Sequence, residues 1–243
     1  MDYATSVEHV RTDGSRLAAA AEAHLTAPVP SCPGWSVHDL VKHVAQVYEH
    51  KIECTRLGRA PDPWPPEWPL AETDPLGWFR DAHARLLAMF HASGPTTPSA
   101  TWWPADQTVG FWARRMAHET AVHRVDAELA IDAATPIDAE LATDGVDEIL
   151  LLMLVGDWSD DPDETMTGQH VAISTGERHW IVTLDRDAVS VSEGDGPSDA
   201  TLAGEPSHLM LWLWGRAPDD AVGMDGDSAL FRGFRSRLAL ATQ

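Results

Sequence analysis

The stretch from Val109 to Ile131 contains no proline and carries charged side chains among apolar ones, which predicts a long helix after Gly110. Glu119 and His123 are four residues apart in it, so they project from one face, one turn apart. The same face continues through apolar residues: Trp112, Met116, Ala127 and Ala130. Because burial of an unpartnered carboxylate or imidazole is costly, the fold must bring a partner to this face.

A divalent metal ion is one such partner, because His and Glu at this spacing can both reach a single ion. The best candidate for a third ligand is His43, in the predicted helix from Val37 to Leu57. Apolar residues recur around it at helical spacing: Leu40, Val44 and Val47. A His-Glu-His set of three ligands leaves one coordination position open, as in catalytic zinc sites.

Simpler interpretations of these residues remain open. His43 is also consistent with a core histidine bonded to a backbone carbonyl or a carboxylate. Glu119 and His123 are also consistent with a simple intrahelical pair, which is worth only about 0.3 kcal/mol. His118 points about 100° away from Glu119 on an ideal helix and is expected to face another surface.

The net charge excludes two classes of function. At −21 over 243 residues it argues against binding to nucleic acid, which depends on Lys and Arg neutralising phosphates, and equally against binding to anionic membranes. No apolar run approaches the roughly 20 residues of a membrane span. The first residues lack the basic start and apolar stretch of a secretory signal, so we expect a cytoplasmic protein.

The two cysteines, Cys32 and Cys54, do not make a disulfide framework. Cys32 lies in the predicted turn Ser31-Cys32-Pro33-Gly34-Trp35. There we expect a small buried residue rather than a nucleophile.

The first half of the chain, residues 1–134, is predicted to be a four-helix bundle. Its helices are expected from about Asp2 to His24, over Val37–Leu57 with Ser36 as N-cap, from about Pro75 to His91, and over the Glu119 stretch. A rigid loop separates the second and third helices and contains Pro61, Pro63, Trp64, Pro65, Pro66, Trp68 and Pro69. Metal sites in such bundles form between facing helices.

The second half, residues 135–243, is predicted to be a small α+β domain that begins near Thr135-Pro136. We expect a helix from Asp138 to Val155. Short β-type runs follow, separated by turn residues: His170–Ser174, His179–Leu184, Ala188–Val191 and Ala200–Ala203. Two further helices are expected, over Pro206–Trp214 and Ser228–Leu240.

Three stretches resemble the mycothiol-dependent maleylpyruvate isomerase family, within the wider DinB-like metal-binding four-helix superfamily. The first is Cys32-Pro33-Gly34-Trp35-Ser36-Val37-His38-Asp39-Leu40, with His43 following. The second is the block 117–128, which contains His-Glu-x-x-x-His-Arg-x-Asp-Ala-Glu. The third is Leu211-Trp212-Leu213-Trp214-Gly215-Arg216. The resemblance covers both halves of the chain in the family's order and implies the fold class α+β, a DinB-like bundle followed by the smaller domain.

The resemblance also implies the chemistry of the site. His43, Glu119 and His123 fall where the family's metal ligands lie, for a divalent ion of the zinc type, with nickel or another divalent ion as alternatives. A low-molecular-weight thiol, mycothiol, is implied as cosubstrate, because metal coordination deprotonates a thiol that is mostly protonated at neutral pH. The partners would be this thiol and a small electrophilic molecule, of which maleylpyruvate is only the namesake.

Two further residues are candidates for catalytic roles. Asp126, three residues after His123, is expected either to orient a metal-bound imidazole or to bond to Arg124 or another helix. Arg216 is expected near the mouth of the metal pocket, bound to an acidic group of the substrate or thiol. The alternative for Arg216 is a surface salt bridge with Asp219 or Asp220.

Arg115, one turn before Glu119, is expected to pair with that carboxylate structurally. Its alternative is contact with an anionic group at the pocket mouth.

Three functions fit these residues. The leading hypothesis is a metal-dependent enzyme in which a thiolate attacks an electrophile, as a thiol S-transferase or a thiol-dependent cis-trans isomerase. The second is a metal-dependent hydrolase with the same three ligands and activated water. The third is a non-catalytic module that binds a metal or another ligand.

Overall fold

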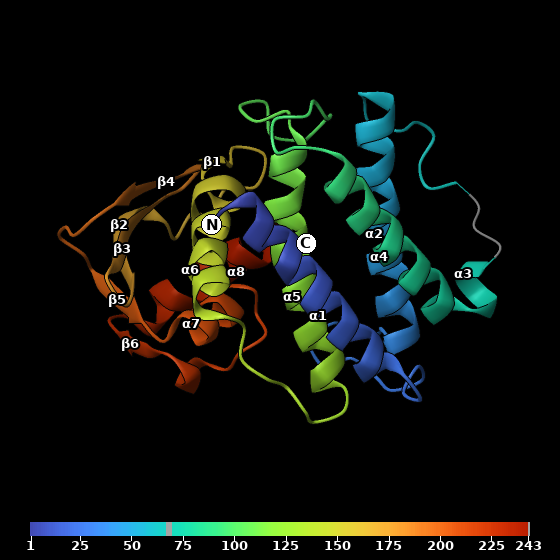
Figure 1. Ribbon diagram of the computed structural model, residues 1–243. Helices are drawn as coiled ribbons and strands as arrows, with labels where there is room; N and C mark the ends of the chain where they lie inside the picture. Colours follow the sequence, from blue (N-terminus) through green and yellow to red (C-terminus); the bar gives the residue numbers. More distant parts are fainter. Residues whose placement is uncertain (67–69, 243) are drawn as a thin grey trace. The chain divides into compact units, whose positions relative to one another are not determined.

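The computed structural model describes residues 1–66 and 70–242, so Trp68 and Pro69 of the proline-rich loop lie outside the described residues. The chain divides into two compact units, Met1–Thr135 and Pro136–Gln243. The first unit is helical, and the second combines helices with a sheet (Figure 1). The predicted α+β class, a helical bundle followed by a smaller α+β part, is confirmed.

Four long helices build the first unit, as the sequence predicts. They are α1 (Tyr3–Ala21), α2 (Val37–Leu57), α4 (Pro75–Ala92) and α5 (Val109–Leu129). The sequence does not predict the short helix α3 (Leu70–Thr73) before α4. Within the part of the chain that the structure covers, no helix combines the length and apolarity needed to cross a membrane.

Each long helix begins where a side chain caps its first turn. Ser36 accepts a hydrogen bond from the Asp39 N–H, and the Asp39 carboxylate accepts one from the Ser36 N–H, which completes a capping box before α2. Asp74 caps α4 just ahead of Pro75, whose fixed φ suits a first turn. Asp2 and Thr108 cap α1 and α5 in the same way. These local signals explain why the helix starts are readable in the sequence.

Helix α5 is buried on nearly every side, although many of its residues are polar. It packs mainly against α1, while α2 packs mainly against α4. Its buried polar residues are His118, Glu119, Thr120, His123, Arg124, Asp126 and Glu128. Because such groups are costly to bury alone, α5 depends on hydrogen-bonded partners from neighbouring segments.

One group of partners centres on Arg124. Its Nε donates to Asp13 Oδ1 of α1 at 3.1 Å, and its Nη1 donates to Glu128 Oε2 at 2.8 Å and to the Thr135 carbonyl at 2.7 Å. Arg124 is almost fully buried, as are both carboxylates. These bonds tie α5 to α1 and to the end of the unit.

A six-stranded sheet lies in the second unit, in the order β1-β4-β3-β2-β5-β6. Its strands are β1 (Gly156–Asp157), β2 (Thr167–Thr175), β3 (Arg178–Asp185), β4 (Ala188–Glu193), β5 (Ala200–Ala203) and β6 (Gly223–Asp225). Strands β2 and β5 pair in parallel, and the other pairs are antiparallel. The four predicted strands are present, whereas β1 and β6 are too short for a sequence pattern.

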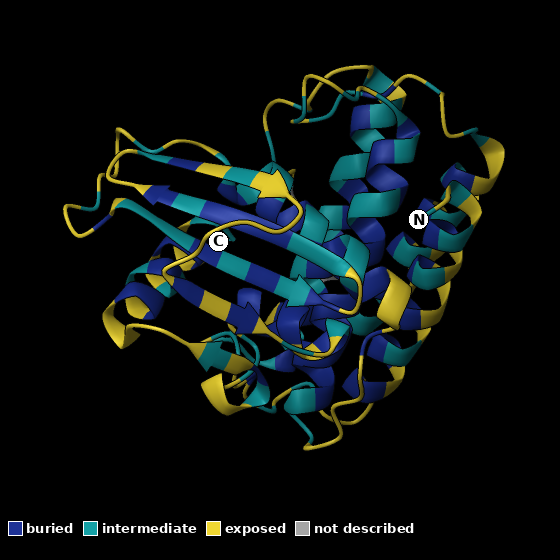
Figure 2. Ribbon diagram, turned by 90° about the vertical axis from the view of Figure 1, so that its left-hand side faces the viewer, coloured by how far each residue is buried: buried dark blue, intermediate teal, exposed yellow. Residues whose placement is uncertain are grey.

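Helices of the second unit cover one face of this sheet (Figures 1 and 2). They are α6 (Ala139–Glu148), α7 (Pro206–Leu213) and α8 (Ser228–Ala241). The helix predicted from Asp138 to Val155 changes character at its end, where η1 (Ile149–Leu154) is a π-helical turn. A short 3₁₀ turn, η2 (Asp219–Ala221), precedes β6.

We expect Arg124→Met to lower the free energy of unfolding by about 3 kcal/mol, because it leaves the buried carboxylates of Asp13 and Glu128 with Arg16 as their remaining cation. Urea unfolding followed by circular dichroism measures the change. The control is Arg11→Met, since Arg11 pairs with Glu8 on the exposed surface of α1. Equal midpoints for wild type and Arg124→Met would contradict the assignment.

Candidate metal centre

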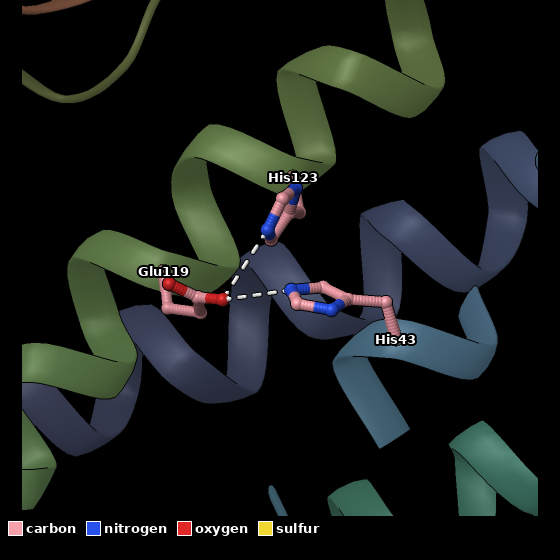
Figure 3. Close-up of side chains that lie close together, drawn as sticks. All are labelled: His43, Glu119 and His123. Carbon is pink, nitrogen blue, oxygen red and sulfur yellow. Dashed lines mark ion pairs between the residues drawn. The ribbon is translucent and has the colours of Figure 1, made fainter. Parts of the chain in front are cut away.

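His43 of α2 and Glu119 and His123 of α5 meet between their two helices (Figure 3). The Oε1 atom of Glu119 lies 3.4 Å from His43 Nε2 and 3.2 Å from His123 Nε2. One ligand atom from each residue lies within 4.8 Å of the others. The structure thus brings together the three residues that the sequence analysis selected as metal ligands.

The site opens to solvent on one side. The side chain of His43 is 36% exposed, whereas those of Glu119 and His123 are 9% and 10% exposed. The α5 residues therefore form the floor, and small molecules can approach beside His43.

Glu119 is ionised despite its burial. Burial by itself raises the pKa of its carboxyl, but the Arg115 guanidinium and the His123 imidazole outweigh burial and hold that pKa well below its ordinary value. Arg115 pairs with Glu119 across one helical turn, as the sequence analysis expected. The floor of the site thus carries a fixed negative charge with its own counterion.

His123 is held between two carboxylates. Its Nε2 faces Glu119, and its Nδ1 lies 2.8 Å from Asp126 Oδ2. Burial lowers the pKa of this imidazole, but Glu119 and the hydrogen bond to Asp126 outweigh burial and raise the pKa to about 9. Without a bound cation, His123 is therefore protonated at neutral pH.

The turn before α2 supports the site from the other side. Ser31 Oγ donates to Asp126 Oδ1, and Cys32 Sγ lies 3.7 Å from Asp126 Oδ2. The Trp35 ring lies 5.0 Å from the His43 ring between centroids. The expectation of a small buried residue at Cys32 is wrong: the residue is partly exposed, with its thiol beside Asp126. The Cys-Pro-Gly-Trp motif marks this turn in the sequence.

The residues present fit a divalent metal ion. Two imidazole nitrogens and a carboxylate oxygen are donors that zinc and similar ions accept. A tetrahedral ion with bonds of about 2.1 Å separates neighbouring ligand atoms by about 3.4 Å. The two separations from Glu119 Oε1, 3.2 and 3.4 Å, are close to that spacing. Asp126 accepts from the remaining nitrogen of His123, which is the usual support of a metal-bound histidine.

Arg216, the remaining candidate, lies in the second unit. Its Nη1 donates to the Trp214 carbonyl at 2.7 Å, and its guanidinium carbon lies 5.7 Å from the centre of the Trp214 ring. Asp219, one of the two acids considered as its partner, accepts from Trp212 Nε1 at 2.9 Å and lies 3.4 Å from Arg235. A role for Arg216 at the metal site stays a prediction.

Comparisons with known proteins match both units. A family model described as the mycothiol maleylpyruvate isomerase N-terminal domain matches residues 7–128, and one described as the MDMPI C-terminal domain matches residues 140–233. A comparison with curated proteins finds no match.

Two crystal structures share the fold. One is of the mycothiol-dependent maleylpyruvate isomerase, with 14% identity, 93% of each chain covered and a TM-score of 0.54. The other is of a histidine-to-alanine mutant of the mycothiol-dependent maleylpyruvate isomerase, with the same identity and coverage and a TM-score of 0.60.

The helical unit contains a His-Glu-His cluster, and an α+β unit follows it in the sequence. The protein therefore has two structural units and a candidate metal centre between helices of the first. Since the two family models match most of the chain, the protein belongs to the mycothiol-dependent maleylpyruvate isomerase family. Membership supports an enzyme that depends on mycothiol and isomerises a small molecule.

We expect Asp126→Asn to lower the pKa of His123, because it removes a negative charge and a strong acceptor from Nδ1. Because the pKa of His123 is higher in the folded protein than the ordinary histidine value of 6.5, protonation of His123 stabilises the folded state at pH values below 6.5. This stabilisation is lost as the pH rises through about 9. The variant should therefore be less stable than wild type at pH 6, and the difference should shrink above pH 9. NMR titration of the imidazole and urea unfolding, both with chelator, measure these effects.

The matched control is Glu53→Gln, which removes a carboxylate from an exposed pair with Arg56 on α2. It should leave the His123 titration unchanged. A His123 pKa that is the same in wild type and Asp126→Asn would disprove the role given to Asp126.

Proposed function

We propose that this protein is a metal-dependent, thiol-dependent isomerase of small electrophilic molecules, with mycothiol as the thiol. The observation that carries the proposal is the convergence of His43, Glu119 and His123 at separations suited to one ion. Family membership supports the thiol and the isomerase activity.

In this proposal His43, Glu119 and His123 hold a divalent ion, most simply Zn²⁺, with Ni²⁺ or another divalent ion as alternatives. When bound, such an ion supplies a Lewis acid that lowers the pKa of a thiol and so favours the nucleophilic thiolate. Asp126 accepts a hydrogen bond from Nδ1–H of His123, so Nε2, on the side of Glu119, is the nitrogen that would lose its proton and bind the ion. Arg115 keeps Glu119 ionised and in place.

Isomerisation and thiol transfer differ in what happens to the thiol. An isomerase returns it unchanged after each turnover, whereas a transferase consumes one thiol for each product. The same residues serve either reaction, because both need a bound thiolate next to an electrophilic carbon. The amount of thiol consumed for each molecule of product therefore distinguishes an isomerase from a transferase.

Activity should require metal and thiol together. We expect turnover of an activated alkene, such as maleylpyruvate, by metal-loaded protein with mycothiol, and loss of most turnover when either is withheld. His123→Ala should lose both stoichiometric metal, measured by elemental analysis, and thiol-dependent turnover, because it removes a ligand from the floor of the site. Thiol titration against product formation tests the isomerase assignment.

The control variant is His91→Ala, since His91 lies exposed on α4 and bonds to the Leu87 carbonyl of its own helix. It should keep full metal content and activity. Equal turnover with and without thiol would favour hydrolysis, and full metal content in His123→Ala would exclude the proposed ligand set.

Arg216 has a separate proposed role, as the group that binds an acidic part of the substrate or thiol. An arginine fork matches a carboxylate better than a lysine does. Asp219, an alternative partner, is already engaged by Trp212 and Arg235. The competing role for Arg216 is a salt bridge with Asp219 or Asp220, since both of these contacts use Oδ1 of Asp219.

Kinetics of Arg216→Lys test this role. We expect a loss of roughly 1–3 kcal/mol in transition-state stabilisation, or about 5–150-fold in kcat/KM, with metal content unchanged. The matched control is Arg235→Lys, an arginine of the same unit that pairs with Asp219. Unaltered kinetics in Arg216→Lys would exclude substrate binding by this side chain.

A further inference from the structure

A cavity of about 160 Å³ lies in the helical unit, and its lining does not include the residues of the His-Glu-His cluster. Helix α2 contributes His50, Lys51 and Cys54 to its lining, and Thr101 and the aromatic rings of Trp102 and Trp112 complete much of the wall. Lys51 follows His43 by eight residues, or about 12 Å along the helix. The cavity is therefore separate from the candidate metal centre.

Lys51 is the unusual group in this cavity. Its Nζ lies 3.3 Å from His50 Nδ1 and 4.6 Å from the centre of the Trp112 ring. No carboxylate of residues 1–66 or 70–242 lies within 4.0 Å of Lys51 Nζ. The chain has one other lysine, Lys42, and that one pairs with Glu72.

The surroundings of Lys51 lower the pKa of its amine. Burial lowers its pKa to about 8, and the nearby Arg115 acts in the same direction, whereas Glu119 and Cys54 act against it. His50 is no source of positive charge at neutral pH, because burial and Lys51 lower its pKa to about 4. The Trp112 face attracts an ammonium and is the main contact that favours the charged form.

A lysine in such a setting is a nucleophile as well as a base. A desolvated amine near another cation is the arrangement that activates lysines for attack on carbonyl carbon. At pH 7 about a tenth of an amine with such a pKa is neutral, far more than for an ordinary lysine. Lys51 lines the cavity, so a molecule that enters the cavity can reach this side chain.

We propose that Lys51 is a nucleophilic lysine that forms a reversible imine with small aldehydes or ketones entering this cavity. The site goes beyond the proposed isomerase and needs neither metal nor thiol. A volume of about 160 Å³ corresponds to about five water molecules at roughly 30 Å³ each, which suits a carbonyl compound of a few carbon atoms.

The reaction balances without an added reagent. The lone pair of the neutral Lys51 Nζ forms a bond to the carbonyl carbon, and the carbon–oxygen double bond opens. Both protons of the amine leave with the oxygen as water, and a carbon–nitrogen double bond remains. Hydrolysis reverses the step, so binding is reversible unless the imine is reduced.

Reductive trapping tests the proposal on the full-length protein, with chelator present and thiol absent. Butanal and cyanoborohydride are added at pH 7, and peptide mass spectrometry measures the rate of adduct formation at each lysine. We expect Lys51 to be labelled at least about tenfold faster than Lys42, which serves as an internal control. The rate at Lys51 should rise from pH 6 through pH 8 and level off above about pH 9, because the neutral fraction of its amine rises over that range. The titratable and charged groups around this amine are His50, Cys54, Arg115 and Glu119.

Two variants test the role of the cavity. Lys42→Arg should leave labelling of Lys51 unchanged, whereas Ala100→Leu, which fills part of the cavity, should slow it by about tenfold with little effect on Lys42. Circular dichroism confirms that each variant is folded. Because the assay needs no turnover, its result is independent of whether the proposed isomerase activity is found.

The proposal is overturned if wild-type Lys51 is labelled no faster than Lys42, since Lys51 would then be a structural cation over Trp112. It is also overturned if labelling of Lys51 is unaffected by Ala100→Leu in a folded variant. Comparison of the two lysines within one wild-type molecule decides the question even if a variant fails to fold.

Discussion

The ionised carboxylate of Glu119 is the constraint on which the helical unit depends. A negative charge at this depth is tolerated only with positive partners, and Arg115 and His123 supply them from α5, while Nε2 of His43 on α2 lies 3.4 Å from the carboxylate. Their geometry fixes how α2 and α5 meet. A site able to hold a cation follows from the same geometry, because groups that gather around a buried carboxylate at these distances are also donors for a metal ion.

Short sequence patterns predict much of the arrangement of the site and its helices. The four-residue spacing of Glu119 and His123 places them on one helix face, and capping residues such as Ser36 and Pro75 mark where helices begin. The lone His43 is predictable because it lies beside the apolar face of its own helix. These features depend on neighbours within a few residues, so sequence reasoning reaches them.

Other features depend on contacts between distant residues and escape such reasoning. The hydrogen bond from Ser31 to Asp126 joins residues 95 positions apart, and no spacing rule predicts it. Cys32 looked like a small core residue because only the folded turn places its thiol beside Asp126. Strands β1 and β6 contain too few residues for a pattern, and they form because β4 and β5 offer them a partner edge.

The protonated state of His123 has a consequence for how the site behaves between turnovers. Arg115 and the imidazolium together balance the carboxylates of Glu119 and Asp126, so the charges of the site are balanced without a metal ion. A metal ion that bound here would displace a proton from His123. A metal ion at this site would be exchangeable and would not be needed for folding. In a zinc finger, by contrast, the chain does not fold without its ion.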